Sequence, residues 1–374
     1  MVFYMSVRVH KFALPILLML FCAVEAQAQQ DTSFTTQEED YSIYDQVEFA
    51  DEKARRYCSP KIFNLSPQRF ISLQYDGQLA HDMRVSSVGS YGEEDKVPAA
   101  ESATATFVGG MRLSANIPVI SKTSLVWQMG ANYWQTGYQI KDLKSEVGSA
   151  NLIRELDQTG LRTMGLNTTV FKPLGEFSFL LFQGSADLSG NYTFRNMQSL
   201  RYLRYSAAAI WGRRPNDRKQ WGVGLARTYR VGEMNYIPVV MFNYTSVNRK
   251  WGTEILFPAR AHFRRTFNPR SLMLAGYELE GQSYRMDYLS DADRSLEIRR
   301  GEMRARVEFQ RQITGFIWLS AQVGWRYNWS FNADALPDDG KEFFRGFTGS
   351  QPYAMLNTLG NPLYFNIGVH LVSP

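Results

Sequence analysis

Apolar and polar residues alternate along most of this chain with the period of a β-strand. In residues 303–310, MRARVEFQ, every odd-numbered residue is apolar and every even-numbered residue is charged or polar. Successive side chains of a strand point to opposite faces, so this segment has one apolar face and one ionic face. The same alternation recurs in residues 104–117, 125–139, 162–170, 315–331 and 362–371. A helical period is indicated only within residues 150–158, so the pattern predicts an all-β protein with long strands.

Strand length and loop length favour a membrane barrel over a secreted β-sandwich. The alternating segments exceed the roughly 5–6 residues of sandwich strands and reach the roughly 9–11 residues that a tilted strand needs to cross a bilayer. Short connections are expected at residues 118–122, 172–176, 213–220 and 313–314. Long connections are expected at residues 84–102, 140–160 and 332–361. Alternating short turns and long loops are typical of transmembrane antiparallel β-barrels of the outer membrane, and the sandwich is kept as the alternative.

The number of strands depends on one short hairpin. The long segments are residues 69–80, 103–117, 123–139, 160–172, 177–193, 200–211, 221–231, 236–247, 271–287, 296–312, 315–333 and 362–373. A further hairpin, residues 251–257 and 259–267, raises the number from 12 strands to 14 strands if it spans the membrane. We favour 12 strands, because Pro258 and the cluster of Arg260, Arg264 and Arg265 fit badly in a wall that faces lipid.

The first 28 residues read as a secretory signal peptide. A basic stretch precedes an apolar run at residues 12–24, and Ala26-Gln27-Ala28 has the small residues of a cleavage site. The mature chain then keeps one cysteine, Cys58, so no internal disulfide is possible. Removing Arg8, Lys11 and Glu25 with the signal peptide lowers the formal net charge from +5 to +4. This mild basicity, without a basic run, gives no reason to expect a nucleic acid partner.

Residues 29–68 differ from the barrel region at 69–374 in composition. Eight acidic residues gather here: Asp31, Glu38, Glu39, Asp40, Asp45, Glu48, Asp51 and Glu52. Such a segment could enter a lumen rich in arginine as a plug. A periplasmic tail without fixed structure is the alternative, and it is favoured slightly.

In a membrane barrel the apolar face of each strand contacts lipid and the polar face lines the lumen. A charge at mid-bilayer on the lipid face costs roughly 2–4 kcal/mol, so the charged face must point inward. Seven side chains are therefore predicted to line the lumen: Arg112, Gln128, Arg304, Arg306, Glu308, Gln322 and Arg326.

Two functions fit this lining. An open lumen suits a channel or transporter for small polar or anionic solutes, and a lumen filled by ion pairs suits a structural or partner-binding barrel. Eight-stranded barrels are packed solid and 16–18 strands leave an aqueous channel, so twelve to fourteen strands fall between these cases. Transport is favoured weakly.

Three stretches carry a resemblance to a known family: AQAQQ at the end of the signal peptide, WGTEILFPARAHFRRTF and LYFNIGVHLV. They resemble an uncharacterised family of outer-membrane β-barrel proteins of the Bacteroidota. The resemblance covers roughly residues 65–373 and is one of pattern. It implies a barrel in the cell outer membrane and carries over no catalytic residue. The chain ends in Val372-Ser373-Pro374, whereas such barrels commonly end in an aromatic residue that the insertion machinery reads.

No enzymatic site is predicted, although an outer-membrane hydrolase is the third possibility. The mature chain has three histidines, His81, His262 and His370. His81 and Asp82 are adjacent and point to opposite faces of a strand, so Asp82 would not orient His81. No spacing suggests a metal site or a phosphate-binding loop, so neither metal nor cofactor is expected. The expected partners are outer-membrane lipid and the insertion machinery, and the oligomeric state is left open.

Overall fold

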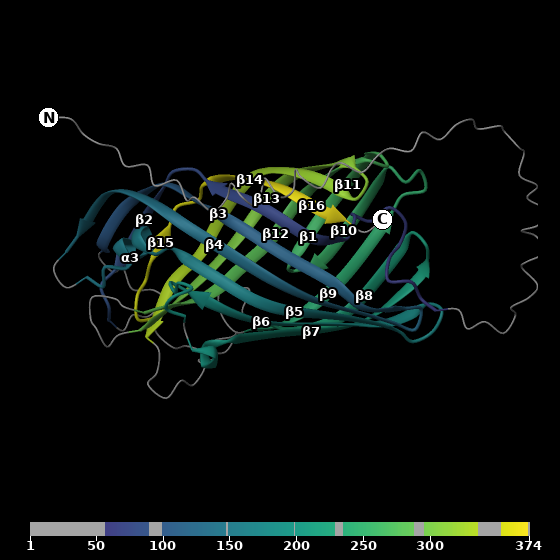
Figure 1. Cartoon of the computed structure of the whole chain (residues 1–374), viewed down its shortest axis with the longest axis horizontal. Coiled ribbons are helices and arrows are strands. Elements are labelled where there is room, and N and C mark those ends of the chain that lie inside the picture. The colour runs from purple at the N-terminus through teal and green to yellow at the C-terminus, as the bar shows by residue number, and fades with distance from the viewer. Residues whose placement is uncertain are drawn as a thin grey trace, which may run out of the picture. The chain divides into compact units, whose positions relative to one another are not determined.

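The alternating segments form antiparallel strands that pair in order around a single closed barrel (Figure 1). The computed structural model describes residues 57–89, 99–146, 149–197, 199–228, 235–287, 295–335 and 353–372. These residues belong to the unit Arg55–Pro374. The predicted signal peptide and residues 29–56 of the predicted N-terminal segment lie outside the described residues.

Most strands that are consecutive in the sequence are also neighbours in the wall of the barrel. The first eight are β1 (Arg69–Gln78), β2 (His81–Ser86), β3 (Ala99–Lys122), β4 (Leu125–Ser145), β5 (Leu161–Pro173), β6 (Ser178–Gly190), β7 (Arg204–Asn216) and β8 (Lys219–Thr228). The others are β9 (Asn235–Thr245), β10 (Trp251–Phe257), β11 (Arg260–Asn268), β12 (Ser271–Met286), β13 (Leu296–Thr314), β14 (Ile317–Ala335), β15 (Thr358–Leu359) and β16 (Leu363–Val372). Within the described residues, two short helices lie in the loops: α3 (Leu152–Gln158) and η2 (Leu200–Tyr202).

Within the described residues the sixteen strands form a wall of fourteen. β1 and β2 together make one wall strand, and β15 and β16 make another. β1 and β2 pair one after the other along β3, and β16 and β15 pair with β1 and β2 in turn. Asp76 of β1 lies opposite Asn366 of β16, and this pairing of first and last strands closes the barrel. Closure leaves no sheet edge at this seam. The predicted all-β antiparallel barrel is confirmed.

The favoured number of twelve strands is wrong, and the alternative of fourteen is confirmed. β10 and β11 are hydrogen-bonded in the wall between β9 and β12. Arg264 points inward and is fully buried, so it never meets lipid. Arg265 points outward and lies over the ring of Trp251, 4.2 Å from its centroid. Pro258 lies in the turn between the strands and Arg260 beside it is exposed, so neither interrupts the wall.

The two ends of the barrel differ in the length of their connections. We call the short-turn end the one with the β3–β4, β5–β6, β7–β8, β11–β12 and β13–β14 turns. The opposite end, the long-loop end, is the one at which β2, β4, β6 and β14 end, each followed in the sequence by a long connection. Figure 1 shows α3, β2 and β15 at the long-loop end and the C-terminus at the other. The predicted alternation of short and long connections agrees with this arrangement.

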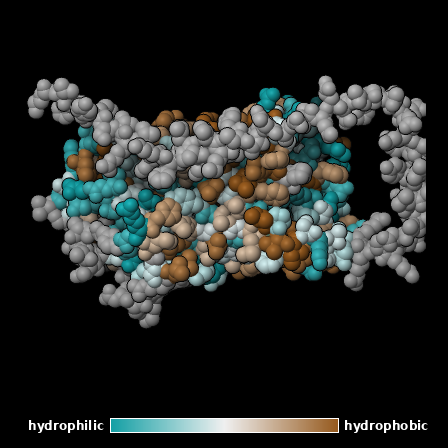
Figure 2. Space-filling model, viewed as in Figure 1, coloured by the Kyte–Doolittle hydropathy of each residue, from teal (hydrophilic) through white to brown (hydrophobic). Residues whose placement is uncertain are grey.

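The alternation of the sequence sorts side chains between the two faces of the wall. On β13, Val307 and Phe309 are 45% and 42% exposed, whereas Arg304 and Glu308 are 5% and 2% exposed. Figure 2 shows one side of the barrel, where apolar side chains gather mostly over the middle and hydrophilic ones towards the ends. The outer face is therefore apolar and the inner face is charged or polar at this height.

Apolar side chains fill the interior at the long-loop end. α3 contributes Leu152, Ile153 and Leu156, which pack in one buried cluster with Leu296 and Ile298 of β13. We call this cluster the apolar cap. The predicted helical segment within residues 150–158 is confirmed by α3.

Two local features fix α3 in the cap. The buried carboxylate of Glu101 accepts hydrogen bonds from the amides of Leu152 and Ile153 at 3.0 and 2.9 Å, which pairs donors that a helix start leaves unsatisfied. The helix ends at Gln158, and Gly160 two residues later has a φ of +67°, in the left-handed region that glycine adopts after helix ends. None of the described helices is long and apolar enough to cross a membrane.

Candidate functional site

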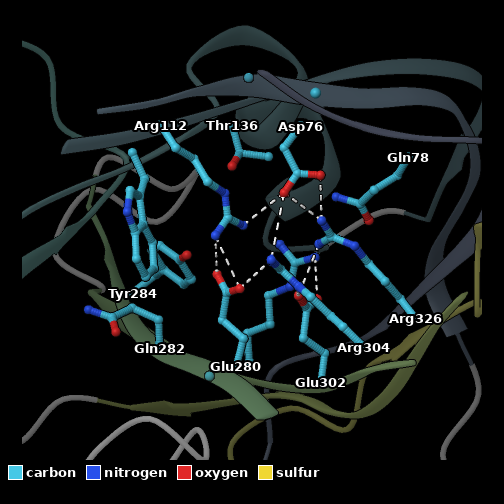
Figure 3. A pocket seen from close by; sticks show the side chains of 15 residues that line it. Asp76, Gln78, Arg112, Thr136, Glu280, Gln282, Tyr284, Glu302, Arg304 and Arg326 are labelled. Atoms are coloured by element: carbon cyan, nitrogen blue, oxygen red, sulfur yellow. Dashed lines mark hydrogen bonds and ion pairs between the residues drawn. The ribbon is translucent and has the colours of Figure 1, made fainter. Parts of the chain in front are cut away.

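Below the apolar cap, charged side chains from opposite sides of the wall meet inside the barrel (Figure 3). We call this set the ionic layer. It consists of Asp76 of β1, Arg112 of β3, Glu280 of β12, Arg300, Glu302 and Arg304 of β13, and Arg326 of β14. Each of these side chains stands on the inner face, because the strand alternation places it there.

The carboxylates of the ionic layer are each held by more than one guanidinium group. Asp76 accepts hydrogen bonds from Nη2 of Arg326 at 2.6 and 2.7 Å and pairs with Arg112 at 3.0 Å. Glu302 is bound by Arg304 at 2.7 Å and by Arg326 at 2.9 Å. Buried charges are tolerated only when they are paired and hydrogen-bonded in this way.

Glu280 links two arginines of the layer, and Arg300 pairs with Glu302 at 2.9 Å. Glu280 pairs with Arg112 at 2.9 Å and with Arg304 at 2.5 Å. The face of the Trp134 ring lies 4.9 Å from the Arg112 guanidinium carbon, and Tyr364 lies 4.7 Å from that of Arg326. Salt bridges and rings thus cross the lumen from β1 and β3 to β12, β13 and β14.

The ionic layer leaves little free volume. The cavity that it lines has about 20 Å³ of space for water. Roughly 10–15 Å³ by this measure holds one water molecule, so the cavity admits one small species. A polar solute larger than that does not fit inside this cavity in the described conformation.

A second ionic group lies closer to the short-turn end. Arg306 pairs with Glu278 at 2.9 Å and with Glu308 at 3.6 Å, and Glu308 also pairs with Arg69. Arg306 donates a hydrogen bond to Oε1 of Gln322 at 3.1 Å. This group narrows the β12–β14 side of the lumen without reaching across it to β4 and β5.

The opposite inner wall, on β3 to β6, is polar and mostly uncharged. We call it the polar inner wall; its members are Ser114, Asn116, Gln128, Asn132, Asn167, Thr169, Gln183 and Ser185. All of them are only half-buried, although they face the inside of the barrel. Asn132 reaches Asp187 of β6 at 3.4 Å inside the barrel, which confirms the inward direction. Water therefore reaches this wall.

Residues 57–68 cross the short-turn end, and we call them the N-terminal strap. The amide of Cys58 donates to the carbonyl of Gly175 at 2.8 Å, and the Thr245 hydroxyl donates to the carbonyl of Phe63 at 2.7 Å. The amide and hydroxyl of Ser66 both donate to Glu254, at 2.9 and 2.8 Å. The strap is thus fastened to the β5–β6 turn, to β9 and to β10.

The strap also covers apolar side chains of the inner wall. Cys58 packs with Phe171, Phe179, Ile210 and Met241 in a buried cluster. Burial raises the pKa of the Cys58 thiol above its ordinary value, so the thiol stays protonated at neutral pH. The described part of residues 29–68 therefore lies at the mouth of the barrel, and residues 29–56 lie outside the described residues.

The structure places all seven predicted lumen residues on the inner face. Arg112, Arg304 and Arg326 belong to the ionic layer. Arg306, Glu308 and Gln322 belong to the second ionic group. Gln128 lies apart from both, on the polar inner wall. That these residues line a path for solutes stays a prediction.

Sequence reasoning missed four members of the ionic layer. Asp76 and Glu280 each lie two residues from other polar side chains of β1 and β12, on the same face of the strand. The alternation could therefore have identified both residues. Arg300 and Glu302 follow Leu296 and Ile298 on the same inward face of β13. Because that face is apolar at its start, its change to a polar face cannot be recognised from the alternation.

The three histidines of the mature chain are buried. His370 lies between Ser72 and Ser320, with nitrogen-to-oxygen distances of 2.9 and 2.7 Å. His81 contacts the carbonyl of Leu79 at 3.0 Å, while the exposed Asp82 accepts a hydrogen bond from Thr104 instead. Among the hydrogen bonds and ion pairs of these histidines within the described residues, we find no carboxylate that would orient a general base. No group of three or more potential metal ligands occurs within the described ranges.

A family model for a domain of unknown function, DUF6268, matches residues 102–372, from β3 to the end of β16. The chain belongs to this family. The expected membership of an uncharacterised barrel family is confirmed, and the Bacteroidota origin stays a prediction. As the family description assigns no function, DUF6268 brings no site residue to the chain.

Comparison with the curated proteins gave no match. Among solved structures, a FadL homologue of Pseudomonas aeruginosa is 8% identical, with a TM-score of 0.37 and coverage of 81% of this chain and 90% of that chain. An outer-membrane channel of Pseudomonas putida F1 is 10% identical, with a TM-score of 0.33 and coverage of 82% and 96%. The outer-membrane protease OmpT of Escherichia coli is 9% identical, with a TM-score of 0.27 and coverage of 83% and 99%. These TM-scores are too low to carry an argument about the function of the DUF6268 chain.

Proposed function

We propose that this protein is an outer-membrane β-barrel that acts as a channel for small polar or anionic solutes, and that the described conformation is its closed state. The proposal rests on one observation. In the middle of the barrel the inner wall from β3 to β6 is polar and only half-buried, and the ionic layer narrows the lumen at one height.

The outer face supports a membrane location. Exposed apolar side chains occur on strands all around the barrel: Met111, Leu113, Ile117, Met129, Leu166, Leu180, Phe182, Trp211, Val223, Leu225, Val240, Phe263, Val307, Phe309, Leu319, Val323, Ile367 and Val369. Soluble monomers rarely expose a contiguous apolar patch larger than a few hundred Å². A lipid bilayer is the solvent that matches such a surface, and the long-loop end would then face the outside of the cell.

The interior supports a gated channel over a permanently open pore. A bare fourteen-stranded wall is wider than side chains alone fill in small barrels. The ion pair of Arg112 and Glu280 joins β3 to β12 across the lumen. We therefore take this pair as the constriction of the channel. Four arginines and three carboxylates line the constriction, which favours anions over cations.

The filled, structural barrel is the second candidate, and the apolar cap favours it. The cap places side chains of α3, β13 and Met355 in one buried apolar cluster at the long-loop end. A barrel that stays filled would serve as a platform for its outer loops.

Conductance in planar bilayers separates the two candidates. The double variant Arg112→Ser, Glu280→Ser removes both partners of the constricting pair, so no lone charge is left buried. We expect rare, small steps for the wild type and frequent, larger, anion-preferring steps for the double variant. The control is the double variant Arg285→Ser, Asp287→Ser. It removes an ion pair of 2.8 Å at the long-loop end of β12 and should conduct as the wild type does. Silence of all three proteins would support the filled barrel.

A further inference from the structure

The cavity within the ionic layer has an excess of positive charge. Its lining includes the guanidinium groups of Arg112, Arg300, Arg304 and Arg326. Three carboxylates face them, those of Asp76, Glu280 and Glu302. Among the described residues that line this cavity, the charges therefore sum to one unit of positive charge.

The rings near this cavity do not cancel the excess charge. Arg112 and Arg326 lie over aromatic faces, which attract cations through a quadrupole and carry no net charge. An uncompensated charge inside a protein is costly, because it has lost its hydration. A counter-ion inside the barrel would remove this cost.

Polar atoms of the same lining lack partners. The Nε–H groups of Arg300 and Arg326 have no acceptor, and the Gln78 side-chain oxygen has no donor. These side chains are 7%, 1% and 3% exposed, so bulk water does not satisfy them. A buried donor left unpaired costs free energy, and two such donors on arginines that both bind Glu302 indicate a missing acceptor. A half-turn of the Gln78 amide exchanges its oxygen and nitrogen and supplies a further donor.

We propose that the ionic layer holds one monatomic monovalent anion, with chloride as the physiological occupant. The volume of about 20 Å³ suits a species close in size to water and excludes tetrahedral oxyanions such as sulfate or phosphate. Guanidinium groups supply the charge and the N–H donors, and the pairs with Asp76 and Glu302 hold them in place. This ion is a resident part of the fold and is bound whether or not the barrel conducts.

Crystals of the refolded mature protein grown in sodium bromide test the assignment directly. Bromide scatters X-rays anomalously and replaces chloride. We expect an anomalous peak among the four arginines. A water molecule without anomalous signal at this place, or bromide on the outer surface alone, would overturn the proposal.

Urea unfolding in lipid vesicles tests the same site in solution. At equal ionic strength, chloride and bromide should stabilise the wild type more than a variant without the site, whereas sulfate, which stabilises proteins by exclusion from their surface, should act equally on both. An anion at ten times its dissociation constant shifts the unfolding equilibrium about tenfold. Arg300→Gln equalises the charges and should abolish this anion dependence. Arg299→Gln, one residue away and paired with Asp334 at 2.7 Å, should keep it.

The two variants also keep the test decisive. If Arg300→Gln does not fold, the bromide peak of the wild type still decides. If the wild type unfolds identically in all salts, the proposal fails. Since no arm measures conduction, a failure here leaves the proposed channel untouched, and silent bilayers leave the anion site untouched.

Discussion

At the residue scale, the position of a side chain in the two-residue period decides which solvent it meets. Arg304 and Val307 of β13 are close in sequence, yet one is 5% exposed among carboxylates and the other 45% exposed on the outside. The inward direction of the seven predicted residues followed from this period alone. Their partners did not, because Arg326 meets Asp76 across 250 positions of sequence. Such a pair requires the number of strands and their register.

Removing one arginine of the ionic layer should be costly. Arg326→Met leaves Asp76 and Glu302 without their shared guanidinium group. Loss of one partner of a buried ion pair costs roughly 3–5 kcal/mol, so the urea midpoint in lipid vesicles should fall sharply.

Arg213→Met is the matched control, since Arg213 is exposed on the outer side of β7. It should change the free energy of unfolding by less than about 0.5 kcal/mol. Equal effects of the two substitutions would contradict the buried network.

At the element scale, the β10–β11 hairpin shows why the strand number was misjudged. Three arginines and a proline looked unsuited to a lipid-facing wall, but single-residue alternation turns Arg264 inward, and the turn holds Pro258. β13 shows the opposite case, where the polar inner face changes to an apolar one at Ile298. An interior that changes from ionic to apolar along one strand cannot be read from a period alone.

The hairpin should depend on its internal ion pair. Arg264 is fully buried and pairs with Glu254 at 2.5 Å. Arg264→Leu should destabilise the barrel by roughly 1–3 kcal/mol, because the largely buried carboxylate of Glu254 loses its cation and keeps only its hydrogen bonds from Ser66. Adding Glu254→Gln should restore part of this loss, since the amide removes the lone charge and still accepts from Ser66.

A double-mutant cycle with urea unfolding measures this coupling. The two substitutions should be non-additive by about 0.5–3 kcal/mol. Additivity within error would place Arg264 outside the pair.

At the scale of the whole molecule, three different groups of residues occupy the barrel from one end to the other. The apolar cap lies at the long-loop end, the ionic layer lies in the middle, and the N-terminal strap crosses the short-turn end. Strand length and alternation were enough to predict the barrel. The alternation also turned Arg112, Arg304 and Arg326 inward, but it could not place α3 or the strap, because both come from segments outside the strand pattern.

We propose that one face of this wall contacts lipid and that the other face lines a water-filled lumen. Leu166 and Asn167 of β5 are neighbours, and they test both faces at one height of the barrel. Leu166 is 63% exposed on the outside, and Asn167 is half-buried on the polar inner wall. A nitroxide label on a cysteine at either position, in a Cys58→Ser background, reports its solvent by electron paramagnetic resonance in lipid vesicles.

We predict that the label at 166 collides with oxygen, which concentrates in lipid, and is protected from a water-soluble nickel complex. The label at 167 should show the reverse. Equal access of the nickel complex to both labels would contradict a membrane-spanning wall, and protection of both from it would contradict a water-filled lumen.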